Sequence, residues 1–279
     1  MDYKAGLLVF FSLVIGSLAF PAPEDDLSKF FDHTDGNARI IGGSEAAAGS
    51  HPHMVALIAG IYGKMFICAG SLVTQRSVLT AAYCIHMIYS GGSIVPSARA
   101  AVGSNRWDSG TEYTLLGNLT HPDFNLWTGK NDITVVITST NVVLSSLVQP
   151  VALIYDYIGG GVTAIVAGWG STTPNSYEPS DILLEVSTTT IGSKECIARV
   201  LKAAIKLKNL IYVNPRNKVC TLNSSKSGIN YGDSGSALLR ADNGQQFGIV
   251  AWGFPGVVDY PDRFVRIGAY ESWLKSVIV

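Results

Sequence analysis

The sequence predicts an all-β protein with a barrel or sandwich architecture. From residue 40 onward the chain is a series of short runs rich in Val, Ile, Thr and aromatic residues, the composition typical of β-strands. Turn-forming clusters such as Ser90-Gly91-Gly92, Asp108-Ser109-Gly110 and Asp242-Asn243-Gly244 separate these runs. Short strands with regular turns between them, few helical stretches and no repeat of fixed period indicate a sandwich or a barrel.

Size and charge narrow the class of protein further. The 279 residues are 47% hydrophobic, so the chain is long and apolar enough to form one large β domain or two small ones. The formal net charge of −1 gives the whole chain no electrostatic attraction to nucleic acid or to an anionic membrane. The sequence contains no CxxC, HExxH or histidine-rich cluster, so we expect no metal and no cofactor.

The first 39 residues are predicted to be removed from the mature protein. The apolar run Ala5 to Phe20 ends in small residues and is shorter than the ~20 residues that span a bilayer. We therefore predict a signal peptide over 1–19 and a secreted, extracellular protein without a membrane span. Residues 20–39 are polar and end in Arg39 before Ile40, which predicts a propeptide cut after Arg39 by an activating protease. The alternative is a disordered tail.

The four cysteines fit an oxidising compartment, where disulfides form. They are Cys68, Cys84, Cys196 and Cys220. Four cysteines allow three pairings, and their spacing does not choose among them.

The strand-like segments continue along the whole region after residue 40. In chain order they are 53–62, 64–74, 77–82, 133–138, 151–155, 163–169, 182–191, 218–222, 236–240 and 245–253.

Two segments have the apolar periodicity of helices. The segment 269–278 places Tyr270, Trp273, Leu274 and Val277 on one face, which predicts a helix docked onto the domain. The second helix is predicted over 194–210, with an apolar stripe of Ile197, Val200, Leu201, Ala204 and Ile205. Seven basic residues lie between 194 and 218. We interpret them as a solvated face, and the alternative is a site for a heparin-like or anionic surface.

The first candidate for chemistry is a serine between glycines. Residues 231–236, YGDSGS, place Ser234 in a turn just before the strand-like 236–240. Small neighbours let the backbone bend so that a hydroxyl and nearby N–H groups point at one spot. A nucleophile beside an oxyanion hole requires this arrangement. Because ordinary turns share the pattern, the motif alone is only moderately specific.

From Ile40 to the C-terminus the chain resembles the trypsin/chymotrypsin-like serine proteases. The motifs follow the order of that family: IIGG at 40–43, CAGSL at 68–72, LTAAYC at 79–84, HPDF at 121–124, NDI at 131–133, AGWG at 167–170, VCT at 219–221, GDSG at 232–235 and WG at 252–253. The resemblance implies a protease domain over 40–279 with a double six-stranded antiparallel β-barrel (chymotrypsin-like) and a C-terminal helix.

The resemblance also implies the disulfides. By analogy Cys68 pairs with Cys84, and Cys196 pairs with Cys220. A third bridge common in the family is absent, because one of its positions is Asn230 and no cysteine lies between 253 and 262.

The activation step implied by the resemblance has its residues in place. Cleavage between Arg39 and Ile40 frees an amine, which in the family pairs with the aspartate before the serine, here Asp233. That pairing orders an oxyanion hole formed by the N–H groups of Gly232 and Ser234. The alternative is that Asp233 only caps a turn.

The implied catalytic triad is incomplete. Asp132 and Ser234 match the aspartate and serine of the family, but Tyr83 stands at the histidine position. A phenol has a pKa of about 10 and cannot accept the serine proton near neutral pH. The serine that precedes Trp-Gly in the family is Ala251 here. The nearest histidine, His86, is three residues from Tyr83, which on a helix is too far to replace it.

The resemblance implies a specificity pocket with an unusual acid. Gly228 lies at its base, Gly253 on its wall, and Asp262 where the family usually has glycine. This is similar to invertebrate collagenase-like members, which accept varied side chains, and Asp262 would receive a basic one. The alternative is that Asp262 is a solvated loop acid.

Three functions are compatible with these observations. The first is a serine-protease homologue with little or no activity, which binds a peptide or protein ligand such as a protease or inhibitor and acts as cofactor, decoy or adaptor. The second is an active endopeptidase of broad chymotrypsin/collagenase-like specificity. The third is an anionic-surface binder that uses 194–218. We favour the first, as a monomer.

Overall fold

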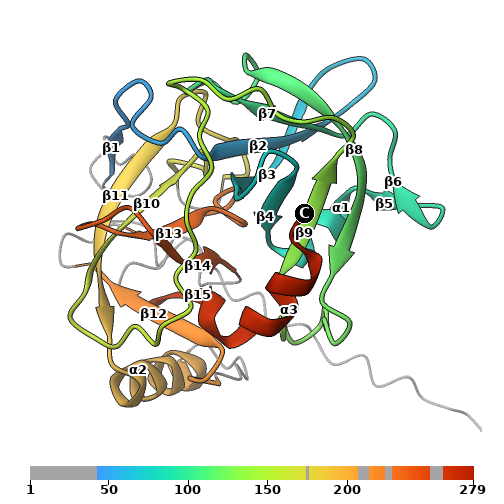
Figure 1. Cartoon of the computed structure of the whole chain (residues 1–279). Helices are drawn as coiled ribbons and strands as arrows, with labels where there is room; N and C mark the ends of the chain where they lie inside the picture. The colour runs from blue at the N-terminus through green and yellow to red at the C-terminus, as the bar shows by residue number, and fades with distance from the viewer. Residues whose placement is uncertain (1–42, 174–175, 207–213, 224–227, 252–259) are drawn as a thin grey trace, which may run out of the picture. The chain divides into compact units, whose positions relative to one another are not determined.

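The computed structural model describes residues 43–173, 176–206, 214–223, 228–251 and 260–279 (Figure 1). The predicted signal peptide, the predicted propeptide and the Arg39–Ile40 bond lie outside these residues. Within the described part of the chain, no helix is both long enough and apolar enough to cross a membrane.

Six antiparallel strands close the first barrel in the order β2-β3-β4-β9-β8-β7. Every residue of β2, β4 and β9 is buried, because these strands contact the barrel interior on one face and other parts of the domain on the opposite face. A small hairpin, β5 and β6, lies outside the barrel. The bounds are β2 Met54–Ala59, β3 Met65–Leu72, β4 Ser77–Thr80, β5 Tyr89–Ser90, β6 Ser93–Ile94, β7 Arg99–Val102, β8 Thr111–Thr120 and β9 Thr134–Thr138.

The second barrel has the strand order β11-β10-β13-β14-β15-β12 and is closed by pairing of β12 with β11. The two-residue strand β1 also pairs with β11. Val166, Leu238, Phe247 and Phe264 are in its core. The bounds are β1 Ser44–Glu45, β10 Thr163–Gly168, β11 Leu184–Ile191, β12 Lys218–Leu222, β13 Ala237–Arg240, β14 Gln246–Val250 and β15 Asp262–Arg266.

The two closed barrels confirm the predicted double-barrel fold, but the individual strands differ in two respects. The segment 151–155 is not a strand: Leu153 forms only an isolated bridge with Gln246, because this segment connects the barrels rather than joining a sheet. Six strands were not predicted: the two-residue strands β1, β5 and β6, and the longer β7, β8 and β15. In β8 the side chains alternate between half-buried and exposed, and the sequence has too little apolar character to reveal it.

The C-terminal helix is confirmed as α3, Glu271–Val277, preceded by the 3-10 turn η2, Ile267–Tyr270. Leu274 is fully buried in a cluster that contains Leu79 and Ile133 of the first barrel together with Ile249 and Val265 of the second. The helix therefore packs on residues from both barrels.

The second predicted helix is α2, Ser193–Lys206, but its apolar stripe was predicted in the wrong phase. Cys196, Val200 and Ala203 are the buried residues, whereas Leu201 and Ile205 are 53% and 78% exposed. The disulfide from Cys196 to β12 sets the inward face, and an apolar periodicity cannot reveal this constraint. The short helix α1, Ala82–Met87, was missed because six residues are too few for a periodic pattern.

Candidate functional site

A cavity of about 450 Å³ has walls from both barrels. Tyr83 on α1 and Asp132 in the loop before β9 come from the first barrel, while Gly232 and Ser234 come from the turn before β13 in the second. The structure thus brings together the three predicted triad positions and the predicted oxyanion-hole glycine.

Backbone hydrogen bonds to both barrels hold the Ser234 turn. The N–H of Ala69 in β3 donates to the carbonyl of Ser234 at 3.0 Å, and the N–H of Gly235 donates to the carbonyl of Val250 in β14 at 2.8 Å. Gly235 has φ +87°, and a Cβ there would lie 2.1 Å from the Ala69 carbonyl oxygen, so only glycine fits. The Ser234 hydroxyl is half-buried and has no hydrogen-bond partner among the described residues.

The Asp132 carboxylate is buried and held from the neighbouring helix. Its Oδ1 accepts a hydrogen bond from the N–H of Tyr83 at 2.8 Å. Burial raises the pKa of Asp132, while hydrogen bonds from the N–H groups of Tyr83 and Ala82 and the charge of Lys218 act in the opposite direction. The preceding residue, Asn131, has φ +53° and accepts a hydrogen bond from the Tyr270 hydroxyl at 2.9 Å, which fixes the loop.

The Tyr83 side chain has a different environment from its backbone. It is 41% exposed, and its phenol makes no hydrogen bond to Ser234 or Asp132. Two further tyrosines line the same cavity, Tyr177 and Tyr231, whose ring centroids are 4.4 Å apart. Burial and a hydrogen bond with Tyr177 raise the pKa of Tyr231. No motif in the sequence indicated this aromatic wall.

None of the four histidines in the described part of the chain lines the cavity. His86 is exposed in the last turn of α1. His121 packs against the rings of Tyr270 and Trp273. His53 is buried, and this burial lowers its pKa to about 3. His51 is paired through Nε2 with Glu185 at 2.6 Å. None of the histidines that the structure describes is therefore placed to receive a proton from Ser234.

The carboxylate of Asp233 lies in a space kept open by glycines. Its Oδ1 accepts the N–H of Gly170 at 2.8 Å and its Oδ2 the N–H of Asn230 at 2.9 Å. A Cβ on Gly168 or Gly170 would lie 2.2 or 2.4 Å from this carboxylate. Burial raises the pKa of Asp233 to about 6, and no cation of the described residues forms an ion pair with it. Ile40, its predicted partner, lies outside the described residues.

Asp262 begins β15 and faces Gly228, but neither residue lines the 450 Å³ cavity. A Cβ on Gly228 would lie 3.1 Å from Asp262 Oδ2, which accepts the N–H of Ile229 at 3.3 Å. Burial raises the pKa of Asp262 to about 7, opposed by the charge of Arg263. Gly253, the third predicted pocket residue, lies outside the described residues.

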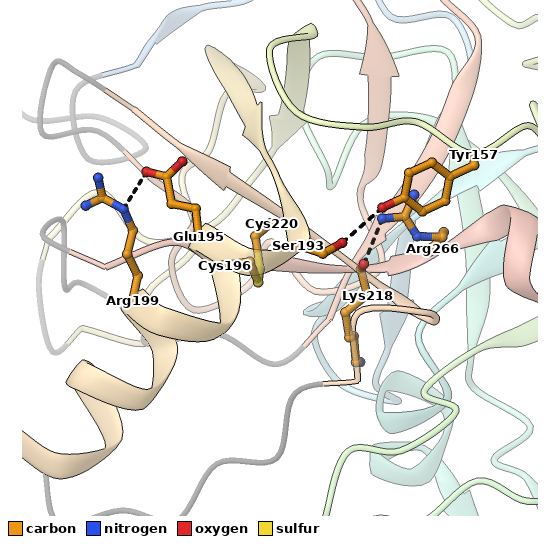
Figure 2. Close-up of a disulfide and its surroundings, with 8 residues drawn as sticks. All are labelled: Tyr157, Ser193, Glu195, Cys196, Arg199, Lys218, Cys220 and Arg266. Atoms are coloured by element: carbon orange, nitrogen blue, oxygen red, sulfur yellow. Dashed lines mark hydrogen bonds and ion pairs between the residues drawn. A yellow bond between two sulfur atoms is a disulfide. The ribbon is translucent and has the colours of Figure 1, made fainter.

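Both disulfide pairings are confirmed. Cys68–Cys84 joins β3 to α1, and Cys196–Cys220 joins α2 to β12. Figure 2 shows the second bridge beside Lys218, whose backbone carbonyl accepts a hydrogen bond from Arg266 at 3.0 Å. In the sequence Lys218 is only one of seven basic residues between 194 and 218, and nothing there indicates that its Nζ donates to the carbonyl of Gly129 in the Asp132 loop, at 3.3 Å. In the described part of the chain, His, Cys, Asp and Glu side chains form no group of three that could hold a metal.

Comparisons with known proteins agree with this geometry. A family model described as Trypsin matches residues 40–274. The chain is 32% identical to Duodenase-1 of Bos taurus over 86% of this chain and 89% of that protein. It is 28% identical to Brachyurin of Leptuca pugilator over 85% and 97%, respectively. The solved structure of neuropsin, described as a serine protease expressed in the limbic system of mouse brain, has a TM-score of 0.71 and 24% identity, and the match covers 85% of this chain and 99% of that one.

Proposed function

Because the chain belongs to the trypsin family, we propose that it is a secreted serine-protease homologue with little or no peptidase activity. It acts by binding a peptide or protein ligand, including other proteases or their inhibitors, as a cofactor, decoy or adaptor. The observation that carries this proposal is Tyr83, which stands beside Asp132 and Ser234 where a general base is required.

Peptide hydrolysis by Ser234 would depend on removal of its hydroxyl proton. Attack by a serine on a carbonyl requires a base that accepts this proton. A neutral phenol is too weak a base to accept it at neutral pH. None of the described histidines lines the cavity. In a comparable triad, loss of the histidine lowers kcat by about 10⁶, and the remaining rate comes from the oxyanion hole and from binding.

The features that support ligand binding are retained. The cavity is walled by Phe66, Tyr177 and Tyr231 as well as Tyr83, and aromatic side chains supply large contact areas at interfaces. The Ser234 turn keeps its bonds to both barrels. A peptide backbone can therefore be held in the cleft without being cut.

Activation by cleavage is part of the proposal. The freed amine of Ile40 would pair with Asp233, whose buried carboxylate has two N–H partners but no described cation. A buried carboxylate gains stability from such a counter-ion. Cleavage after Arg39 would then order the N–H groups of Gly232 and Ser234.

The proposed ligand contact at the pocket is Asp262, with Gly228 at the base and Gly253 on the wall. Glycine at 228 leaves room above the Asp262 carboxylate, which supports binding of a basic side chain. Because burial raises the pKa of Asp262 to about 7, we expect this preference to strengthen as the pH rises through neutrality.

Hydrolysis of a mixed peptide library tests the proposal. The secreted protein, cut after Arg39, is compared with Tyr83→His, Ser234→Ala and the double variant. We expect the natural protein to match Ser234→Ala, and Tyr83→His to hydrolyse peptides at least about 10³-fold faster, since a base has been restored. The double variant controls for contaminating protease. Turnover by the natural protein well above Ser234→Ala would overturn the proposal.

The alternative is an active secreted endopeptidase, activated by cleavage after Arg39. It is favoured by the intact Ser234 turn and by the family, since the similar neuropsin is itself described as a serine protease. It requires another base, and His86 on α1 is the first residue to change. Two results together would support this alternative: the natural protein hydrolyses peptides faster than Ser234→Ala, and His86→Ala loses this hydrolysis.

A further inference from the structure

The helix α2 has large apolar side chains on the face that it turns to solvent. Leu201 is 53% exposed and Ile205 is 78% exposed. They are four residues apart and therefore neighbours on the helix surface, and the exposed Ala198 lies one turn before Leu201. Figure 1 shows α2 at the outer edge of the second barrel, beside β12. We refer to Ala198, Leu201 and Ile205 as the outer ridge.

The disulfide between Cys196 and Cys220 fixes the direction of the outer ridge. Cys196 and Val200 are buried on the inward face of α2. Leu201 follows Cys196 by five residues and Ile205 follows Val200 by five, an offset of about 140° around the helix axis. Because the bridge to β12 prevents rotation of α2, the outer ridge cannot turn into the core. Its exposure is therefore a property of the folded domain.

Positive charge lies next to the outer ridge. Lys194 and Lys202 are both exposed and lie four residues to either side of Ala198, so they are its neighbours on the helix. The nearest acid on α2, Glu195, is paired with Arg199 at 2.9 Å (Figure 2). Within the described part of the chain, Lys194 and Lys202 form no ion pair. The outer ridge is thus flanked by cations that attract an anionic partner.

The composition of this face favours lipid over protein or polysaccharide. Protein interfaces are enriched in aromatic residues and arginine and depleted in lysine, whereas α2 has no aromatic residue and its Arg199 is already paired. A sulfated polysaccharide attracts lysines but offers no apolar phase to Leu201 and Ile205. An anionic bilayer accepts both kinds of side chain, because lysine stems reach the phosphates while neighbouring apolar groups enter the acyl region.

We propose that the outer ridge and its flanking lysines dock the protein on the surface of an anionic lipid bilayer. Leu201 and Ile205 enter the boundary between headgroups and acyl chains, and Lys194 and Lys202 contact lipid phosphates. The helix lies in the plane of the surface and does not cross it. No residue of α2 lines the 450 Å³ cavity, so lipid binding leaves the cleft residues available. This inference goes beyond the proposed binding of a peptide or protein ligand.

Co-sedimentation of the secreted protein with lipid vesicles tests the inference. The vesicles contain either equal parts of phosphatidylcholine and phosphatidylserine or phosphatidylcholine alone. We expect binding to the anionic vesicles that weakens as salt is added, and much less binding to the neutral ones.

Two double variants separate the apolar and the charged contributions. Leu201→Ala with Ile205→Ala should lower the partition coefficient at least about tenfold, since six carbon atoms no longer leave water. Lys194→Gln with Lys202→Gln should lower it about twentyfold, since each lysine near an anionic surface contributes about a factor of five.

The chain offers a matched control for each double variant. Leu116 and Ile61 of the first barrel are 68% and 83% exposed, so Leu116→Ala with Ile61→Ala removes the same atoms elsewhere. Lys64→Gln with Lys275→Gln makes the same change in net charge away from α2. Neither control should alter binding to the anionic vesicles. All the replaced side chains are exposed, and thermal unfolding should show that the variants remain folded.

Absence of binding to the anionic vesicles would overturn the inference, as would equal losses in the outer-ridge variant and its control. Binding to immobilised heparin that depends on Lys194 and Lys202 but not on Leu201 and Ile205, without vesicle binding, would assign the surface to an anionic polysaccharide instead. Equal binding to neutral vesicles would refute the role of the lysines. The assays involve no peptide ligand, so their failure is distinguishable from failure of the proposed function.

Discussion

The second barrel supplies the cleft with a serine turn whose backbone is hydrogen-bonded to β3 and β14, whereas the first barrel supplies the cleft with α1 and the aspartate loop. In the serine turn the backbone is held from both sides, by Ala69 of β3 and Val250 of β14, and Ser234 lines the cavity. In α1 only the backbone of Tyr83 is held: its N–H donates to Asp132 at 2.8 Å, while the residue is 41% exposed.

This contrast shows that the shape of the site does not depend on the side chain at position 83. The position of α1 depends on the Cys68–Cys84 disulfide and on a backbone hydrogen bond, and neither involves the side chain at 83. The serine turn, by contrast, depends on glycines whose absent side chains leave room for neighbouring backbone. We therefore expect a substitution at position 83 to be tolerated more readily than one at Gly235.

The largest effect is expected for Gly235→Ala. A Cβ there would lie 2.1 Å from the carbonyl oxygen of Ala69 and 2.2 Å from Thr80 Oγ1, so the barrels would have to separate locally. We expect a loss of about 5 kcal/mol in the free energy of unfolding, or no folded protein. Gly244→Ala is the control: it has a comparable φ of +70° but open space, and should cost only about 1 kcal/mol. If urea denaturation gave equal losses of unfolding free energy for Gly235→Ala and Gly244→Ala, the steric explanation would be contradicted.

The next effect is a dependence of stability on pH. Burial raises the pKa of Asp262 to about 7 in the folded protein, above the ordinary value of 3.8. Between these values the unfolded chain loses its proton first, so the stability of the folded state falls by about 1.4 kcal/mol per pH unit, or about 4 kcal/mol in all. Asp262→Asn should remove this contribution and leave the smaller slope of the same sign that comes from Asp233, whose pKa is raised to about 6 by burial. Urea denaturation at pH 4 and pH 7 measures the change in unfolding free energy. If the natural protein and Asp262→Asn changed by the same amount, Asp262 would not be buried as described.

The two disulfides allow a more even comparison of the barrels. The paired cysteines are 16 and 24 residues apart, so loop-closure entropy predicts a similar loss of about 3 kcal/mol for each removal. Replacing Cys68 and Cys84 by alanine should also shift the NMR signal of Tyr83, while replacing Cys196 and Cys220 should not. If the second pair shifted it as strongly, α1 would not be held by its own disulfide.

The smallest effect concerns the face that α2 turns inward. Val200 is 1% exposed and Leu201 is 53% exposed. Val200→Ala should cost about 2 kcal/mol in the free energy of unfolding, since it removes buried methyl groups, while Leu201→Ala should change it by less than about 0.5 kcal/mol. If thermal unfolding showed a larger loss for Leu201→Ala than for Val200→Ala, the buried face of α2 would be the stripe predicted from the sequence.

Much of this architecture was predictable because the relevant information is local. Turn residues and β-branched runs mark most strands, and the motif order indicated the double barrel and the meeting of Tyr83, Asp132 and Ser234. The phase of α2 was not predictable, because a disulfide to a distant strand decides it. The approach of Lys218 to the Asp132 loop was also missed, since it depends on how two barrels pack and no pattern near either residue reports it.

The position of α3 has a consequence for the order in which the protein is built. Leu79 and Ile133 belong to a barrel whose last strand ends at Thr138, yet they are covered by Leu274 on the final helix. During synthesis the first barrel therefore emerges with this part of its apolar surface exposed to water until the rest of the chain arrives. We expect folding to wait for that late contact, so that the cleft between the barrels closes last.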